Sequence, residues 1–167
     1  MDIKKALLQE HSKENSLLIA KFIGDDPERF EVLMQCFFDK DDQMSQRAAW
    51  VLTFCWNNYP DLVLPYIKQM VDLLPTDVHP AVKRNIVRIF QTQSIPEEFH
   101  GRLLDHCFKL LMDRKEAIAI RVFSMSVIDQ LSKLYPDIQQ ELIAYLQDEI
   151  PYGSAGFKSR ARKILKA

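Results

Sequence analysis

The amino-acid sequence predicts an all-α protein, an α-solenoid of antiparallel helix pairs. Three arginines, Arg47, Arg84 and Arg121, recur at intervals of 37 residues, each within an apolar pattern of helical period. The units that they mark end at prolines, namely Pro60, Pro96 and Pro136. A repeat of this length is typical of solenoids, in which each unit buries its apolar face against its neighbours. We therefore expect about nine helices in a short right-handed superhelix without any sheet.

The composition fits a folded helical protein. Of the 167 residues, 47% are hydrophobic and 27% are charged, which is too apolar for a disordered chain. No apolar run approaches the ~20 residues that cross a bilayer, so we expect no membrane segment. Cys36, Cys55 and Cys107 lack metal-type spacing and lie in apolar stripes, which favours reduced core thiols in a cytoplasmic protein.

Charge is nearly balanced over the whole chain, at −1, but it is unevenly distributed. Residues 1–44 carry 6 basic and 10 acidic groups, whereas residues 151–167 carry 5 basic groups and no acidic group. The chain thus runs from an acidic start to a basic end, which bears on the charge of its partners.

The first 44 residues are expected to form N-terminal helices. Apolar spacing predicts one helix over residues 3–23, which Gly24 ends as a C-cap. Asp26 is expected to cap the next helix, and Pro27 to occupy its first position.

Three repeat units of about 37 residues are expected over residues 45–150. Their helices are predicted over residues 44–58, after Tyr59-Pro60, after His79-Pro80, after Pro96, from Asp113, and after Tyr135-Pro136. Asp113 followed by Glu116 resembles a capping box, so we expect a long helix to begin there. Residues 151–167 add a C-terminal capping helix that begins at Ser154, which completes a single domain over residues 1–167.

Residues 62–90 resemble one unit of the HEAT repeat. Leu64-Pro65 match the Leu-Pro start of that pattern, Asp77 matches the Asp of its short turn, and Val82-Lys83 match the start of its second helix. The match is partial in the neighbouring units. The resemblance is therefore to the HEAT/armadillo class as a whole, over residues 26–167, and not to one subfamily.

The resemblance implies a structural role for the repeated arginines. In such families the turn Asp and the helical basic residue commonly form a ladder between units. The corresponding residues here are Asp42, Asp77 and Asp113 with Arg47, Arg84 and Arg121. The alternative is a cationic stripe on the concave face that binds phosphate.

Four aromatic residues cluster near the helix predicted over residues 44–58. Leu52, Cys55, Trp56 and Tyr59 make the better core stripe of that helix. This leaves Trp50 and Phe54, which share another face, as candidates for contact with a neighbouring helix or a partner. The alternative is that all four aromatic residues fill the interface between repeats.

The C-terminal run FKSRARKILKA has two faces. Phe157, Ala161, Ile164 and Leu165 form its apolar face, and Lys158, Arg162 and Lys166 form a basic row on the opposite side. The row fits a solenoid cap, because a terminal unit needs a polar outer face. It also fits a surface for an acidic partner or a nucleic-acid backbone.

No pattern in the sequence indicates catalysis, a cofactor or a metal site. The four histidines lack metal-ligand spacing, and there is no Gly-rich phosphate loop or nucleophile elbow. We therefore expect a non-enzymatic scaffold that binds a protein or peptide partner. The candidate partner-binding residues are Arg47, Trp50, Phe54, Arg84, Arg88, Arg121, Lys158, Arg162 and Lys166.

Nucleic-acid binding is the second interpretation. It rests on a resemblance to the DNA-alkylation-repair proteins built on such repeats, which use Trp and Asp residues in a basic groove. Trp50 and Trp56 are present, but no Asp lies within a helical turn of either, so catalytic residues are not carried over. An isoelectric point near 6.4 also lacks the basic character of a dedicated nucleic-acid binder.

Overall fold

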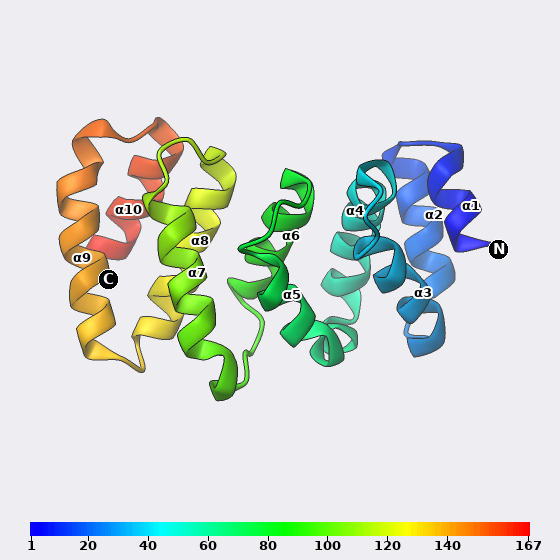
Figure 1. Ribbon diagram of the computed structural model, residues 1–167, viewed down its shortest axis with the longest axis horizontal. Helices are drawn as coiled ribbons and strands as arrows, with labels where there is room; N and C mark the ends of the chain where they lie inside the picture. Colours follow the sequence, from blue (N-terminus) through cyan, green and yellow to red (C-terminus); the bar gives the residue numbers. More distant parts are fainter. The chain divides into compact units, whose positions relative to one another are not determined.

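The computed structural model describes all 167 residues, which form ten α-helices and three 3-10 helices without any strand (Figure 1). The α-helices are α1 (Ile3–Gln9), α2 (Lys13–Ile23), α3 (Pro27–Phe37), α4 (Asp42–Asn58), α5 (Ile67–Leu73), α6 (Pro80–Phe90), α7 (His100–Met112), α8 (Ile118–Ser132), α9 (Pro136–Glu149) and α10 (Ala155–Lys166). The 3-10 helices are η1 (Pro60–Tyr66), η2 (Glu97–Phe99) and η3 (Ile150–Tyr152). The predicted all-helical class is confirmed.

The chain divides into two compact units, residues 1–89 and residues 90–167. In the first unit α4 contacts α1, α2 and α3, and in the second unit α8 contacts α7, α9 and α10. Each unit has its own apolar core. The largest buried side chains of the first are Leu7, Ile19, Ile23, Phe30, Leu33, Met34, Phe37, Leu52, Ile67 and Met70, and those of the second include Phe90 and Phe157. The single-domain organisation and the handedness of the superhelix stay predictions.

The first predicted helix is in fact two helices, so the expectation of one helix over residues 3–23 was wrong. The backbone is extended at Glu10, and Ser12 caps α2 by accepting a hydrogen bond from the Asn15 amide at 3.1 Å. The Asn15 side chain donates to the Ala6 and Glu10 carbonyls at 2.8 and 2.9 Å. It thus satisfies main-chain acceptors that the end of α1 leaves unpaired.

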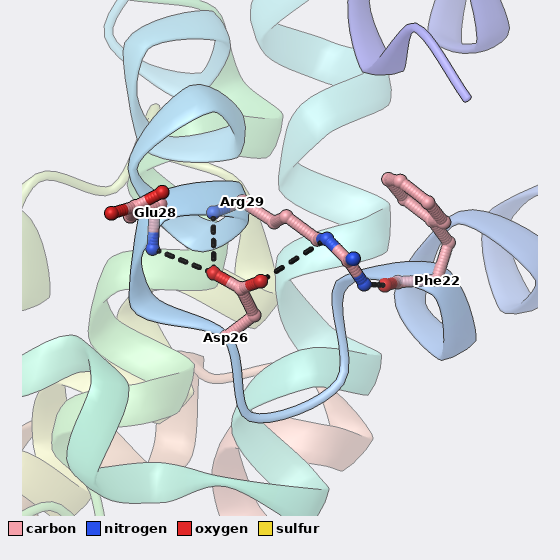
Figure 2. Close-up of polar contacts among 4 residues, drawn as sticks. All are labelled: Phe22, Asp26, Glu28 and Arg29. Atoms are coloured by element: carbon pink, nitrogen blue, oxygen red, sulfur yellow. Dashed lines mark hydrogen bonds and ion pairs between the residues drawn. The ribbon is translucent and has the colours of Figure 1, made fainter.

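The junction of α2 and α3 forms as the sequence predicts (Figure 2). Gly24 ends α2 with a positive φ of 56°. The Asp26 carboxylate then accepts hydrogen bonds from the Glu28 and Arg29 amides at 2.9 and 3.1 Å. Arg29 pairs with Asp26 through Nε at 3.1 Å and donates from Nη1 to the Phe22 carbonyl at 2.7 Å. One arginine therefore ties the first turn of α3 to the last turn of α2.

Two prolines shape the segment after α4. Pro60 opens the 3-10 helix η1, and Pro65 lies inside it, so α-helical geometry resumes only at Ile67. Leu64, which follows Pro60 in this segment, does not join the core, because its side chain is 46% exposed. The tighter winding of the 3-10 helix shifts it off the face that α5 buries.

The helix predicted from Asp113 begins later, at Ile118. Asp113 instead accepts a hydrogen bond from the Lys115 amide at 2.9 Å, and the Glu116 amide donates to the Asp113 carbonyl at 3.1 Å. The Glu116 carboxylate reaches forward to the Ala117 amide at 2.9 Å. These residues form a turn, so the capping-box interpretation was wrong.

Candidate functional site

Several of the candidate residues meet in a hollow of about 370 Å³ in the first unit. Its lining residues are Gln46, Trp50 and Thr53 of α4, Ala81, Arg84, Asn85 and Arg88 of α6, and His11 between α1 and α2. We call this set the α4–α6 hollow. It lies at the small end of the range of ligand pockets, which suits a side chain or short segment of a partner better than a large ligand.

A buried polar pair forms part of the wall of the α4–α6 hollow. The Thr53 hydroxyl lies 2.6 Å from Oδ1 of Asn85, to which it donates, and each of the two side chains is 6% exposed. The Asn85 amide donates in turn to the Ala81 carbonyl at 2.8 Å. These bonds join α4 to α6 and hold the orientation of the Asn85 side chain, because buried polar groups are costly to leave unpaired.

The charge of the α4–α6 hollow comes from arginine. Arg84 and Arg88 are both exposed and stand one helical turn apart on α6. The eight lining residues include no carboxylate. The hollow is therefore locally cationic, which favours an anionic group of a ligand.

An aromatic pair faces the arginines. The rings of Trp50 and His11 lie 5.0 Å apart between centroids, with an interplanar angle of 57°. Trp50 is half-buried, whereas His11 is exposed. The indole thus offers a flat apolar surface beside two guanidinium groups, a combination that is common in binding sites.

A comparison with family models matches residues 3–167 to a HEAT repeat domain. The chain belongs to this HEAT repeat family. The match confirms the resemblance read from residues 62–90 and the predicted class of helical-repeat solenoid. Comparisons with curated proteins and with solved structures find no match.

Two of the three repeated arginines of this HEAT repeat chain have structural contacts. Arg47 donates from Nη1 to the Leu7 carbonyl at 2.8 Å. Arg121, which is 8% exposed, donates from Nε to the Leu111 carbonyl at 2.8 Å and from Nη2 to the Tyr145 hydroxyl at 3.3 Å. Their partners are main-chain and phenolic oxygens instead of the turn carboxylates that the resemblance implied. The carboxylate ladder was therefore the wrong explanation for these two residues.

Arg84 occupies the equivalent position in the middle unit but is exposed and lines the hollow. The alternative interpretation, a stripe of three cations, does not hold either, since Arg121 is buried. Arg84 thus lines a pocket large enough for a ligand group, whereas Arg121 is buried.

The aromatic residues of α4 separate into two environments. Trp50 lines the α4–α6 hollow, whereas Phe54 lines another hollow together with Leu17 and Gly24 of the α2 end. Both are half-buried, as expected for a face outside the main core. Tyr59 was expected in the core stripe, and that was wrong because it is 40% exposed at the end of α4.

The C-terminal basic row lies on α10, in the second unit. Arg162 and Lys166 are exposed and Lys158 is half-buried, while Phe157 and Ala161 on the opposite face are buried. Ser154 caps α10 as predicted, by accepting from the Phe157 amide at 3.3 Å.

Arg160 lies beside this row but points inward. It donates to Gln91 at 3.0 Å and hydrogen-bonds to the Ser126 hydroxyl. These contacts tie α10 to α8 and to the segment after α6, so Arg160 has a structural role within the second unit.

The groups that could support covalent chemistry are held in the core. All three cysteines are buried free thiols. Burial raises the pKa of the Cys55 and Cys107 thiols to about 12, so both are neutral at ordinary pH. His100 is fixed between the Ile95 carbonyl and the Tyr135 hydroxyl, at 2.8 and 2.9 Å.

The structure offers neither a metal cluster nor a membrane-spanning helix. No group of three or more His, Cys, Asp or Glu side chains is placed to hold a metal ion. No helix has the length and apolar character needed to cross a membrane.

Sequence reasoning identified Trp50, Arg84 and Arg88 but missed four polar members of the hollow. His11 and Gln46 have the sequence surroundings of ordinary surface residues, and Thr53 and Asn85 each lie within an apolar helical run. A polar residue within a predicted apolar stripe was the available signal for Thr53 and Asn85, because a buried polar side chain needs a partner.

Proposed function

We propose that this chain is a non-enzymatic cytoplasmic scaffold and that it binds a protein or peptide partner through the α4–α6 hollow. The observation that carries this proposal is the placement of exposed Arg84 beside half-buried Trp50, in a hollow between α4 and α6. Membership of the HEAT repeat family supports the general class, since such solenoids use extended helical surfaces for recognition.

The chemistry of the hollow suits a partner side chain and its flanking backbone. The Trp50 indole can pack against an apolar stem. Gln46 can exchange hydrogen bonds with main-chain groups, and the arginines supply donors for carbonyl or anionic oxygens. Such a site binds by shape and charge complementarity and requires no covalent step.

A synthetic peptide array tests the proposal. Amidated and acetylated peptides are screened against the full chain, and the affinity of the best binder is measured by calorimetry. We expect Trp50→Ala to weaken this peptide about tenfold or more, because a buried aromatic contact is a typical hot spot.

Tyr152→Ala supplies the matched control, since Tyr152 is an exposed aromatic residue of the second unit. It should leave the affinity unchanged. Equal affinities for the Trp50→Ala variant and the wild type would rule out the hollow as the binding surface. Binding of duplex DNA in place of any peptide would instead support the nucleic-acid interpretation.

A further inference from the structure

A second hollow, of about 610 Å³, lies in the second unit, where α8 and α10 contact each other (Figure 1). We call it the α8–α10 hollow. The charged and polar side chains that these helices contribute to its lining are Ser126, Asp129 and Gln130 of α8, Lys133 at the end of α8, and Arg160 and Lys163 of α10. The lining side chains therefore include three cations and one carboxylate.

Arg160 is a donor with a fixed position in the α8–α10 hollow. Its Nη1 donates to Gln91 at 3.0 Å and to the Ser126 hydroxyl, and the side chain is half-buried. Both acceptors are neutral, and both bonds use the same nitrogen. A guanidinium has five N–H groups, so Nε and Nη2 carry three further hydrogens. Because the two bonds hold the guanidinium in place, a carboxylate that binds to it meets donors in a set orientation.

The positive charge of the α8–α10 hollow is balanced only in part. Its one carboxylate, Asp129, is half-buried and lies four residues before Lys133. Burial raises the pKa of the Asp129 carboxyl, and the nearby charge of Lys133 lowers it in part. Asp129 thus offsets the charge of Lys133, which leaves Arg160 and Lys163, three residues apart on α10, as the excess. This side of the hollow favours an anionic group of a ligand.

The α8 side of the hollow provides acceptors. Oε1 of Gln130 is buried and has no hydrogen-bond partner within the protein. Such an atom costs free energy unless a donor reaches it. Rotation about the last torsion of a glutamine side chain is soft, so the amide can turn its oxygen towards a ligand. Asp129 is a second acceptor next to it in the sequence. A ligand that fits the hollow therefore carries a donor as well as an anion.

This requirement distinguishes between two kinds of ligand. The phosphodiester backbone of DNA has no hydrogen-bond donor, and it would bring repeated negative charge to Asp129. An acidic residue of a peptide has a carboxylate and main-chain N–H groups close to it. We therefore infer that the α8–α10 hollow binds an acidic residue of a peptide, with the carboxylate on Arg160 and Lys163 and a neighbouring main-chain N–H on Gln130. This site goes beyond the proposed function, because it lies in the other unit and shares no residue with the α4–α6 hollow.

Two blocked peptides that differ only in the carboxylate test the inference. Acetyl-Ala-Glu-Ala-amide and acetyl-Ala-Gln-Ala-amide are titrated into the full chain at constant ionic strength, and the backbone amide signals of α8 and α10 are followed by NMR. We expect saturable shifts, and we expect the Glu peptide to bind about tenfold more tightly than the Gln peptide. Equal binding of the two peptides would overturn the inference.

Lys163→Ala tests the cationic side of the site. Arg162→Ala is the matched control, because Arg162 is the adjacent cation on α10 and does not line the hollow. Both side chains are exposed, so neither change should disturb the fold. We expect Lys163→Ala to weaken binding of the Glu peptide about threefold and Arg162→Ala to leave it unchanged. Equal weakening by both would indicate general attraction to a basic helix and would overturn the inference.

Gln130→Met tests the acceptor side, because methionine has a similar length but no strong acceptor. Since Oε1 has no partner in the fold, the urea midpoint of this variant should equal or exceed that of the wild type. The Glu peptide should bind about threefold less tightly. A lower midpoint with unchanged affinity would show that Gln130 serves the fold and would overturn the inference.

Comparison ligands separate this site from the other interpretations. Inorganic phosphate and duplex DNA are titrated in the same way, and shifts of α8 and α10 with either of them but not with the Glu peptide would overturn the inference. The Trp50→Ala variant separates it from the proposed function. Shifts of α8 and α10 that persist in this variant would support a second site whatever the result for the α4–α6 hollow, whereas their loss would assign the peptide to that hollow and overturn the inference.

Discussion

The Thr53 hydroxyl and Oδ1 of Asn85 lie 2.6 Å apart, and these two residues, 32 positions apart in the sequence, join α4 to α6. The pair sits among buried apolar residues of α4 and α6, so its net stabilisation depends on both partners being present. It also sets the wall of the α4–α6 hollow, which links the stability of the first unit to the geometry of the candidate site.

Thr53→Val should destabilise the protein. Valine keeps the shape of threonine but removes the hydroxyl, which leaves the buried Asn85 carbonyl without its donor. The expected loss is about 1–3 kcal/mol in the free energy of unfolding. Urea denaturation measures this loss as a lower midpoint, with the dependence of the unfolding free energy on urea concentration unchanged.

A double variant supplies the control for this pair. Adding Asn85→Leu to Thr53→Val replaces both polar partners and should recover part of the loss, because no buried acceptor then stays unpaired. Strictly additive losses from the two substitutions would contradict an energetic coupling between them.

Arg121→Ala should destabilise the fold much more than Arg84→Ala does. Arg121 is buried with hydrogen bonds to two oxygens, and its guanidinium lies 4.8 Å from the Phe157 ring centroid, so its removal should cost about 1.5–3 kcal/mol. Arg84 is exposed, so its removal should change stability by less than about 0.5 kcal/mol. Thermal or urea unfolding of the two variants side by side measures the contrast, and equal losses would refute it.

The contrast between these arginines shows what a repeat in a sequence can predict. The 37-residue interval correctly indicates that Arg47, Arg84 and Arg121 occupy equivalent places on helices. It carries no information about the neighbour of each side chain, which depends on how successive helices pack. Arg121 donates a hydrogen bond to the Leu111 carbonyl, whereas Arg84 lines the α4–α6 hollow.

The ends of the helices could be predicted from the chemistry of neighbouring residues, and the wrong predictions fell where a turn competes with a helix cap. Asp26 and Gly24 act as predicted because capping depends on residues within one turn. Asp113 has the same chemistry but forms a turn, since the amides of Lys115, Glu116 and Ala117 make their hydrogen bonds within that turn. The Thr53–Asn85 contact was beyond prediction because it depends on the packing of α4 against α6.

Asp26→Ala should remove the cap of α3 and the ion pair with Arg29 (Figure 2). The expected cost is about 1 kcal/mol in the free energy of unfolding. Asp26→Asn keeps the capping oxygen and should cost only a few tenths of a kcal/mol, because the exposed ion pair contributes little.

Asp25→Ala is the matched control for this change, because Asp25 is the adjacent exposed acid and caps no helix. Urea unfolding of all three variants decides the point. A cost for Asp26→Asn as large as that for Asp26→Ala would assign the effect to charge instead of capping.

Stability should fall at alkaline pH through the buried thiols. In the folded state burial raises the pKa of Cys55 and Cys107 from 9.0 to about 12, which favours the neutral thiols. Stability from this source is complete below pH 9, and it is lost as the pH rises towards 12 because the unfolded thiols ionise first.

The loss should approach about 1.4 kcal/mol for each pH unit and each thiol within that window. Unfolding free energies of the wild type and of Cys107→Ala are compared at several pH values from neutrality up into that window. We expect a shallower decline for the variant. Parallel declines would show that Cys107 ionises alike in the folded and unfolded states.

Reversing the charge of the basic row of α10 should show whether the row is a polar cap or a binding surface. Lys158 lies in the first turn of α10, whereas Arg162 and Lys166 lie towards its C-terminus. The opposite face of the helix buries Phe157 and Ala161, which is the arrangement of a polar cap. Changing all three cations to Glu places negative charge at positions 162 and 166, where the helix dipole favours positive charge, and the change at position 158 in the first turn offsets part of this, so the protein should lose about 0.3–1 kcal/mol of stability.

The same triple variant should bind the array-selected peptide as well as the wild type does, because the α4–α6 hollow belongs to the first unit and the row to the second. Calorimetry at two salt concentrations measures this. A basic row that served a nucleic-acid backbone would behave differently: duplex DNA would bind the wild type with an affinity that falls steeply with salt, since each phosphate contact releases counterions. The Glu variant would then lose that binding together with its salt dependence, and the row would be a binding surface and not a cap.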